Sequence, residues 1–171
     1  MLKNAMCYKE ELQRKFQEVF YDLDYIYYSG GTGNYNLMIP ENNFEKHCFA
    51  SVDKDNNIIG YIAYNVDFAA KSCYNFGAIS FNRGNLVFTK DLLRAIDDIF
   101  RKYRMNRLDF YCFIDNPIRV TYQKLVEKYG GRVVGILEDN AMLLDGKLHS
   151  SIMFELKAMS YLAKKGVNLN V

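Results

Sequence analysis

The segment FGAISFNRGNLVFTKDLLRAIDDIFRKY, residues 76–103, decides the fold because it joins a buried strand to an amphipathic helix. Phe76–Phe81 has the apolar character of a buried strand, and a helix is predicted from Thr89, its expected N-cap, to Tyr103. Apolar residues recur along that helix at helical spacing: Leu92, Ile96, Ile99 and Tyr103, with Leu93 and Phe100 beside them.

The loop between this strand and helix is a candidate anion site. A strand that enters a helix through a loop leaves free backbone N–H groups at the helix N-terminus, where the helix dipole also favours negative charge. Arg83 adds a positive side chain to the same loop. The segment therefore suggests a site for a phosphate-bearing cofactor, and an ordinary strand–loop–helix joint is the alternative that these residues leave open.

Length and composition indicate one globular domain over residues 1–171. Half of the 171 residues are apolar, which is enough for a substantial core. The net charge of +2 gives no electrostatic argument for a nucleic-acid partner. The four cysteines lack CxxC spacing, so we expect free thiols, a reducing compartment and a cytoplasmic protein. We expect no signal peptide and no membrane contact, because no long apolar run is present.

The N-terminal third predicts a helix and an aromatic segment. Residues 8–23 have the pattern of an amphipathic helix with a core-facing stripe. The cluster Tyr25, Tyr27 and Tyr28 could line a substrate cleft, with core or rim packing as the default. Gly31-Thr32-Gly33 lacks a preceding strand and a third glycine, so we interpret it as a mobile surface loop and not a nucleotide motif.

The rest of the chain predicts a mixed sheet flanked by helices. Two strands, over 47–52 and 58–64, precede the strand of Phe76–Phe81, and no first strand is evident near the N-terminus. A strand over 107–114 after the 89–103 helix implies a parallel crossover. The remaining elements are a helix capped by Asn116 and ended by Gly130-Gly131, a hairpin of strands 132–137 and 150–156 around Asp145-Gly146, and a short helix over 157–165.

This order of elements, read with the local motifs, resembles the GNAT N-acetyltransferase superfamily. The motifs are Asn57–Ile62 after a polar turn, Asn116 with the helix end Lys128–Gly131, and the closing hairpin Gly135–His149. The hairpin spacing is similar to the branch that includes ribosomal-protein N-terminal acetyltransferases. The likeness covers about residues 47–156 and implies an α/β (α+β) fold with a GNAT-like central mixed sheet.

The resemblance implies an acetyl-CoA-dependent transfer to an amine of a small molecule or a protein. The strand backbone of Ala78, Ile79, Ser80 and Phe81 would hold the pantetheine arm and polarise the thioester carbonyl. Arg83, Gly84, Asn85 and the helix start near Thr89 would hold the phosphates. Asn116 and Tyr122 are the expected catalytic residues at the thiol end, Tyr122 protonating the leaving thiolate.

The sequence departs from the family at two places. The family's phosphate loop has the pattern Gln/Arg-x-x-Gly-x-Gly/Ala, but the aligned segment here is GNLVFT, residues 84–89, which lacks the required glycines. Arg83 and Gly84 remain nearby but out of register. The family's catalytic tyrosine aligns near Val126, and Tyr122 lies one turn earlier on the same helix face, where a core aromatic is the open alternative.

Several roles stay open at this stage. Asp67, Glu138 and Asp139 are the nearest candidate general bases, and Ser80 and Asn82 could orient a water. His47 and His149 lack ligand spacing, so no metal is expected. A catalytically silent protein that keeps the fold and binds CoA or a protein partner is the alternative function, favoured by the altered loop. Exposed edge strands allow a homodimer.

Overall fold

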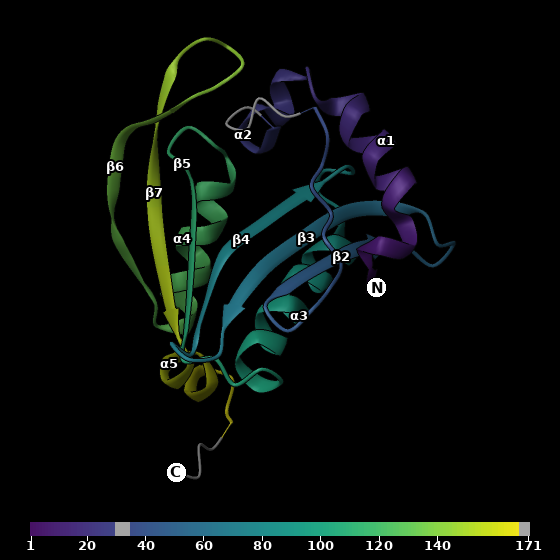
Figure 1. Cartoon of the computed structure of the whole chain (residues 1–171). Coiled ribbons are helices and arrows are strands. Elements are labelled where there is room, and N and C mark those ends of the chain that lie inside the picture. Colours follow the sequence, from purple (N-terminus) through teal and green to yellow (C-terminus); the bar gives the residue numbers. More distant parts are fainter. Residues whose placement is uncertain (30–34, 168–171) are drawn as a thin grey trace.

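A computed structural model describes residues 1–29 and 35–167, and Gly31-Thr32-Gly33 lies outside these ranges. The chain forms a seven-stranded sheet in the order β1-β2-β3-β4-β5-β7-β6, with helices on both faces (Figure 1). The strands are β1 Leu2–Asn4, β2 Lys46–Val52, β3 Ile58–Asp67, β4 Ser72–Ser80, β5 Arg107–Phe113, β6 Arg132–Met142 and β7 Leu148–Lys157. The helices are η1 Ala5–Tyr8, α1 Lys9–Val19, η2 Leu23–Tyr25, α2 Ile26–Ser29, α3 Leu86–Arg101, α4 Ile118–Tyr129 and α5 Ala158–Lys164.

The sheet is mixed, which confirms the expected fold class. β1 to β4 pair antiparallel in sequence order, β4 pairs parallel with β5, and β5, β7 and β6 pair antiparallel. The parallel β4–β5 step is the predicted crossover through α3. Sequence patterning missed β1, because three residues paired to Phe49–Ser51 are too short for a periodic signal.

Two apolar cores lie on opposite faces of the sheet. Phe16 and Leu12 of α1 pack with Tyr61 and Ile79 on one face. α3 and α4 pack on the other face together with α5, where the large buried cluster includes Ile96, Ile99, Val126 and Phe154. β3 is buried on nearly its whole length, as expected for a strand that is apolar on both faces.

β4 and β5 separate after a short contact, and this separation shapes the molecule. Their parallel pairing consists of Ser72 with Arg107 and Cys73 with Leu108, although β4 continues to Ser80 and β5 to Phe113. Figure 1 shows the two strands diverging above this contact. A bulge accompanies the separation: two residues of β4 lie between Tyr74 and Gly77 where β3 has one, and Asn75 has φ 52.

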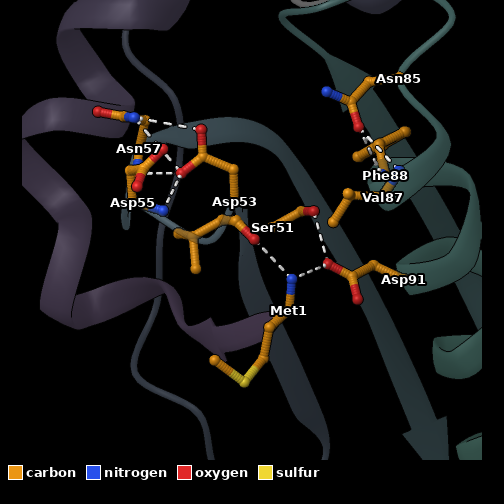
Figure 2. A network of polar contacts seen from close by, with 10 residues as sticks. Met1, Ser51, Asp53, Asp55, Asn57, Asn85, Val87, Phe88 and Asp91 are labelled. Atoms are coloured by element: carbon orange, nitrogen blue, oxygen red, sulfur yellow. Dashed lines mark hydrogen bonds and ion pairs between the residues drawn. The ribbon is translucent and has the colours of Figure 1, made fainter.

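The helix after β4 begins earlier than the sequence predicts. α3 starts at Leu86, and its N-cap is Asn85, whose Oδ1 accepts from the N–H groups of Val87 (2.8 Å) and Phe88 (3.2 Å) (Figure 2). The prediction of Thr89 as N-cap was wrong; Thr89 Oγ1 instead donates to the Asn85 carbonyl within the first turn. The apolar pattern of the sequence indicated too late a start for α3. Leu86 and Val87 are exposed, so the first turn does not follow the spacing of the core-facing residues.

A buried carboxylate ties α3 to the sheet. Asp91 is 6% exposed and accepts a hydrogen bond of 2.7 Å from the Ser51 hydroxyl of β2. The Met1 nitrogen lies 2.7 Å from the same carboxylate and donates to the Val52 carbonyl (Figure 2). These contacts fix the orientation of α3 against β1 and β2, and so fix its N-terminal end relative to β4.

The second half of the chain follows the expectations closely. Asn116 Oδ1 accepts from the Ile118 N–H at the start of α4, and Gly130 ends the helix with φ 70. Gly146 has φ 75 in the turn between β6 and β7, as the Asp145-Gly146 pair predicts. β6 is longer than predicted because a bulge between Leu137 and Ala141 extends it to Met142. No helix over 1–29 and 35–167 is long and apolar enough to cross a membrane.

A close contact between β3 and α3 explains how a bulky residue fits in the first turn of α3. A Cβ built on Gly60 would lie 2.3 Å from the Phe88 ring and 2.7 Å from the Ile79 carbonyl oxygen. The missing side chain at Gly60 therefore makes the space that the Phe88 ring occupies.

We expect Gly60→Ala to lower the free energy of unfolding by about 1–3 kcal/mol, because the added methyl group overpacks against Phe88 and a backbone oxygen. Gly135→Ala is the matched control, since a Cβ there meets no atom within 4 Å. Urea denaturation of both variants measures the difference. Equal stability of the two variants would contradict the contact.

Candidate active site

The separation of β4 and β5 opens a cavity of about 850 Å³. Its wall brings together nine of the residues that the sequence predicts for binding and catalysis, contributed by β4, the β4–α3 loop, α3 and α4: Ala78, Ile79, Ser80, Arg83, Gly84, Asn85, Thr89, Asn116 and Tyr122. Residues that are up to 44 positions apart in sequence thus share one space because the strands that carry them diverge. A volume of this size is typical of a ligand site.

β4 offers backbone groups to this cavity. The Phe81 N–H donates to the Ile59 carbonyl of β3 at 2.9 Å, so Phe81 faces β3 and does not line the cavity. Residues along a strand alternate in the edge to which their N–H and C=O groups point. Ala78 and Ser80 therefore direct these groups to the opposite edge, where β5 has moved away. This edge can bind an extended, amide-bearing ligand in place of a strand.

At the loop end of the cavity, Arg83 contacts η2, which lies between α1 and α2. Its guanidinium pairs with the Asp24 carboxylate at 3.0 Å, donates to the Asp24 carbonyl, and lies 4.9 Å from the centre of the Tyr25 ring. Both charged side chains are more than half exposed, so the pair is weak and can exchange partners. Gly84 has φ 74, which a glycine adopts without strain.

The helix N-terminus at this end is already capped. Asn85 Oδ1 accepts from the Val87 and Phe88 N–H groups, which are among the donors that a phosphate would use. An anion at this position competes with the Asn85 side chain for those donors. Arg83 and Asn85 thus line the cavity, and both are engaged within the protein.

Tyr122 lies on α4 at the other end of the cavity, and it is both a core aromatic and a wall residue. Its ring packs edge-on against Phe110 with centroids 5.0 Å apart, and it is buried. Burial raises the pKa of Tyr122, so the phenol stays protonated at neutral pH and can act as a proton donor. Asn116 is held at the start of α4 by the contact of its side chain with the Ile118 N–H.

Cys112 of β5 also lines the cavity, near Tyr122. Burial raises the pKa of Cys112 to about 11, so it is a neutral thiol at pH 7 and a poor nucleophile. This favours direct attack of a substrate on a bound reactant over an intermediate carried on the cysteine.

The side of the cavity below α1 is aromatic. Phe16, Tyr25, Tyr28 and Tyr61, which we call the aromatic wall, line it and belong to the core on that face. The tyrosine cluster at 25–28 is therefore at the cavity, as the cleft interpretation predicted. Sequence reasoning missed Phe16 and Tyr61, because each has the pattern of an ordinary core residue. Their position beside the gap shows only in the tertiary structure.

A histidine lies behind the cavity wall, against the rings of Tyr27 and Phe113. His149 is 8% exposed, and its ring nitrogens lie 3.1 Å from Asp115 on one side and 3.1 Å from Asp145 on the other. Asp115 follows β5 and Asp145 lies in the β6–β7 turn, so the imidazole ties the hairpin to the start of α4. Leu143 of the hairpin packs with Ile26 of α2 and Phe113 of β5 beside it.

Of the other candidate polar residues, only Ser80 is among the described residues that line the cavity. Asp67, Glu138 and Asp139 do not line the cavity, and Asp67 Oδ1 accepts from the Ala70 N–H in a turn. Ser80 lines it and donates to the Asn82 carbonyl at 2.8 Å. His47 packs among aromatic rings of β2 and β3, and burial lowers its pKa, which indicates a structural role.

Comparison with solved structures identifies the architecture. Spermidine/spermine N-acetyltransferase SpeG from Vibrio cholerae, determined with manganese ions, superposes with a TM-score of 0.62 at 18% identity over 71% of each chain. A chimera of the Vibrio cholerae enzyme and hSSAT gives a TM-score of 0.59 at 18% identity, over 69% of this chain and 71% of that chain. The chain has the GNAT fold. No protein-family model matches the sequence, and no curated protein does.

A further variant of the Vibrio cholerae enzyme gives a TM-score of 0.61 at 20% identity, over 72% of this chain and 70% of that chain. At such identities the GNAT likeness shows the fold and leaves the substrate open. The manganese belongs to the Vibrio cholerae structure. Within 1–29 and 35–167 of this chain, no group of three or more His, Cys, Asp or Glu side chains could hold a metal ion.

We expect His149→Ala to lower the midpoint of thermal unfolding by about 5 °C at pH 7, because the hairpin loses its tie to Asp115 and Asp145. Hydrogen bonds, the largest from the Lys147 N–H and a smaller one from His149, lower the pKa of Asp145. A lowered carboxyl pKa stabilises the fold above the ordinary value near pH 4, and this contribution is lost as the pH falls through the folded value.

The difference in midpoint between wild type and His149→Ala should therefore shrink below about pH 4. Thermal unfolding followed by circular dichroism from pH 3 to 7 measures it. A difference that stays constant over this range would contradict the contact between His149 and the Asp145 carboxylate.

Proposed function

We propose that the protein is an acetyl-CoA-dependent N-acetyltransferase that acetylates an amine. The GNAT fold and the SpeG neighbours support a transferase of this type. The observation that carries the proposal is the cavity at the β4–β5 separation, which gathers the free edge of β4, a cationic loop and a protonated tyrosine. The edge of Ala78 and Ser80 suits the pantetheine amides, and Arg83 suits the phosphates.

In the proposed reaction, the neutral amine attacks the thioester carbonyl carbon and the carbonyl oxygen gains negative charge. A backbone N–H of the β4 edge near Ala78 stabilises that charge. The C–S bond then breaks, the sulfur takes a proton from the Tyr122 hydroxyl, and the nitrogen loses its extra proton to water. Tyr122 recovers a proton from solvent. Burial raises the pKa of Tyr122, so the phenol is protonated at neutral pH when the thiolate forms.

A catalytically silent protein with the same fold is the second candidate. One observation favours it: Asn85 already occupies the Val87 and Phe88 N–H groups, and the Phe88 side chain fills the first turn of α3. Such a protein would bind CoA without turnover, or would bind a protein partner. Acetyl-CoA-dependent release of free thiol in the presence of amines separates the enzyme from the silent protein.

We expect Tyr122→Phe to lower kcat about 100-fold and to leave KM for acetyl-CoA within about twofold, because the variant removes the proton donor and keeps the ring. Thiol release with a saturating amine measures kcat. Phe110 and Phe154 hold the ring in both proteins, so circular dichroism should show an unchanged fold. An undiminished kcat would exclude Tyr122 as the acid.

We expect Asn85→Asp to weaken CoA binding about tenfold while the free energy of unfolding stays equal or rises. A carboxylate caps α3 as well as an amide does, but it repels the pyrophosphate and competes for the same N–H groups. Calorimetric titration with CoA and urea denaturation measure the two effects. Asn85→Ser is the control, because it keeps a neutral cap. Unchanged CoA affinity in Asn85→Asp would show that the phosphates do not bind at this loop.

A further inference from the structure

The charges around the cavity are already paired. Asp24 and Arg83 are the acidic and basic side chains among the described residues that line it, and they bind each other at 3.0 Å. Asp115 and Asp145 do not line the cavity, and both contact His149. In the site without a cofactor, a cationic substrate would therefore have to displace Arg83 from Asp24.

The aromatic wall penalises charge as well. Phe16 and Tyr28 pack edge to face with ring centroids 6.0 Å apart. The Tyr61 hydroxyl donates to the Met38 carbonyl at 3.3 Å, so its polar atom is used within the protein. Burial raises the pKa values of Tyr28 and Tyr61, so both phenols are neutral and the wall carries no charge of its own. Arg83 covers the Tyr25 ring, and its positive charge repels an ammonium from that face.

A buried apolar cluster lies next to the cavity wall at Phe113. Ile26 of α2, Phe113 of β5 and Leu143 of the β6–β7 hairpin are buried together, and each is less than 7% exposed. Tyr27 and Ala141 pack on the same cluster. The contacts of His149 with Asp115 and Asp145 hold the β6–β7 hairpin in this position. This cluster joins α2 to the β6–β7 hairpin beside the cavity.

We propose that the acceptor of this enzyme is a small amine with an aromatic ring, bound uncharged with its ring on Phe16, Tyr25, Tyr28 and Tyr61. This rests on the proposed acetyltransferase function. A ring packed edge-on or offset against these side chains gains aromatic contacts that an aliphatic chain lacks. An amine that enters uncharged can attack the thioester without a positioned base.

The test compares kcat/KM at saturating acetyl-CoA for aniline, 2-phenylethylamine, hexylamine, spermidine and a short peptide with a free N-terminus. Thermal unfolding with acetyl-CoA is measured first. We expect kcat/KM for 2-phenylethylamine to exceed that for hexylamine, an amine of the same kind without a ring, by at least about tenfold. Spermidine and the peptide should be poorer still.

The pH profile gives an independent readout. The kcat/KM for 2-phenylethylamine should rise about tenfold per pH unit between pH 6.5 and 8.5, because only the neutral fraction of this amine reacts. The value for aniline, which is uncharged throughout, should stay flat. A rise for aniline would show that a group of the protein titrates as a base, and that result would overturn the part of the proposal that dispenses with one.

A charge variant tests the role of the lining. Met38 lines the cavity and is 73% exposed, so substitutions there should fold. Met38→Glu adds a free carboxylate, and we expect kcat/KM for spermidine to rise about tenfold over Met38→Gln, the uncharged control of similar size. Equal values in the two variants would show that charge does not select the acceptor.

The outcomes separate the two proposals. Acetylation of spermidine, hexylamine or the peptide at a rate equal to or above that of 2-phenylethylamine would overturn the acceptor proposal and leave the acetyltransferase function intact. Absence of a thermal shift with acetyl-CoA at millimolar concentration would overturn the acetyltransferase function, and the acceptor proposal with it. Preference for the ring-bearing amines would support both.

Discussion

The separation of β4 from β5 is the constraint on which the site depends. β4 and β5 begin as parallel neighbours at Ser72–Arg107 and Cys73–Leu108 and then separate. β5 pairs with β7 along its opposite edge over its whole length. β4 keeps one unpaired edge, and that edge becomes the wall of a cavity.

The loop below this cavity shows how the fold accommodates an altered sequence. Bulky residues replace the small ones that a close phosphate contact would favour, and Gly60 across the sheet supplies the space for Phe88. Asn85 satisfies the first N–H groups of α3, and Asp24 satisfies Arg83. These N–H groups and the Arg83 side chain are therefore paired without a ligand, which stabilises the loop while the site is empty. Binding of a phosphate then requires an exchange of partners, which makes the affinity sensitive to Asn85 and Asp24.

The pairing of Asp24 with Arg83 also bears on the part of the cavity where the acceptor would bind. In the empty site Asp24, the acidic side chain of the described cavity wall, is bound to Arg83, and the side of the wall below α1 consists of rings. The solved GNAT-fold neighbours include a spermidine/spermine N-acetyltransferase, and a shared fold leaves the acceptor open. The acceptor that we propose for this chain rests on the aromatic wall.

Local patterns in the sequence predicted the mixed sheet, the crossover through α3, the end of α4 at Gly130 and the turn at Gly146, because these depend on residues close together in the chain. The N-cap of α4 is Pro117 and not Asn116 as predicted, although the Asn116 side chain accepts from the Ile118 N–H. The same patterns missed β1 and placed the start of α3 at Thr89 instead of Leu86. Most of the predicted site residues lie at one cavity, since the strand, the loop and α4 were identified correctly.

The tertiary structure alone decided which core residues face a gap. Phe16 and Tyr61 have the pattern of ordinary core side chains, and only the divergence of β4 and β5 turns them into a wall. The pairing of Arg83 with Asp24, 59 positions away, and of His149 with Asp115, 34 positions away, was equally hidden. Periodicity records which residues are buried, but the partner of a charge and the place of a cavity depend on how distant segments pack.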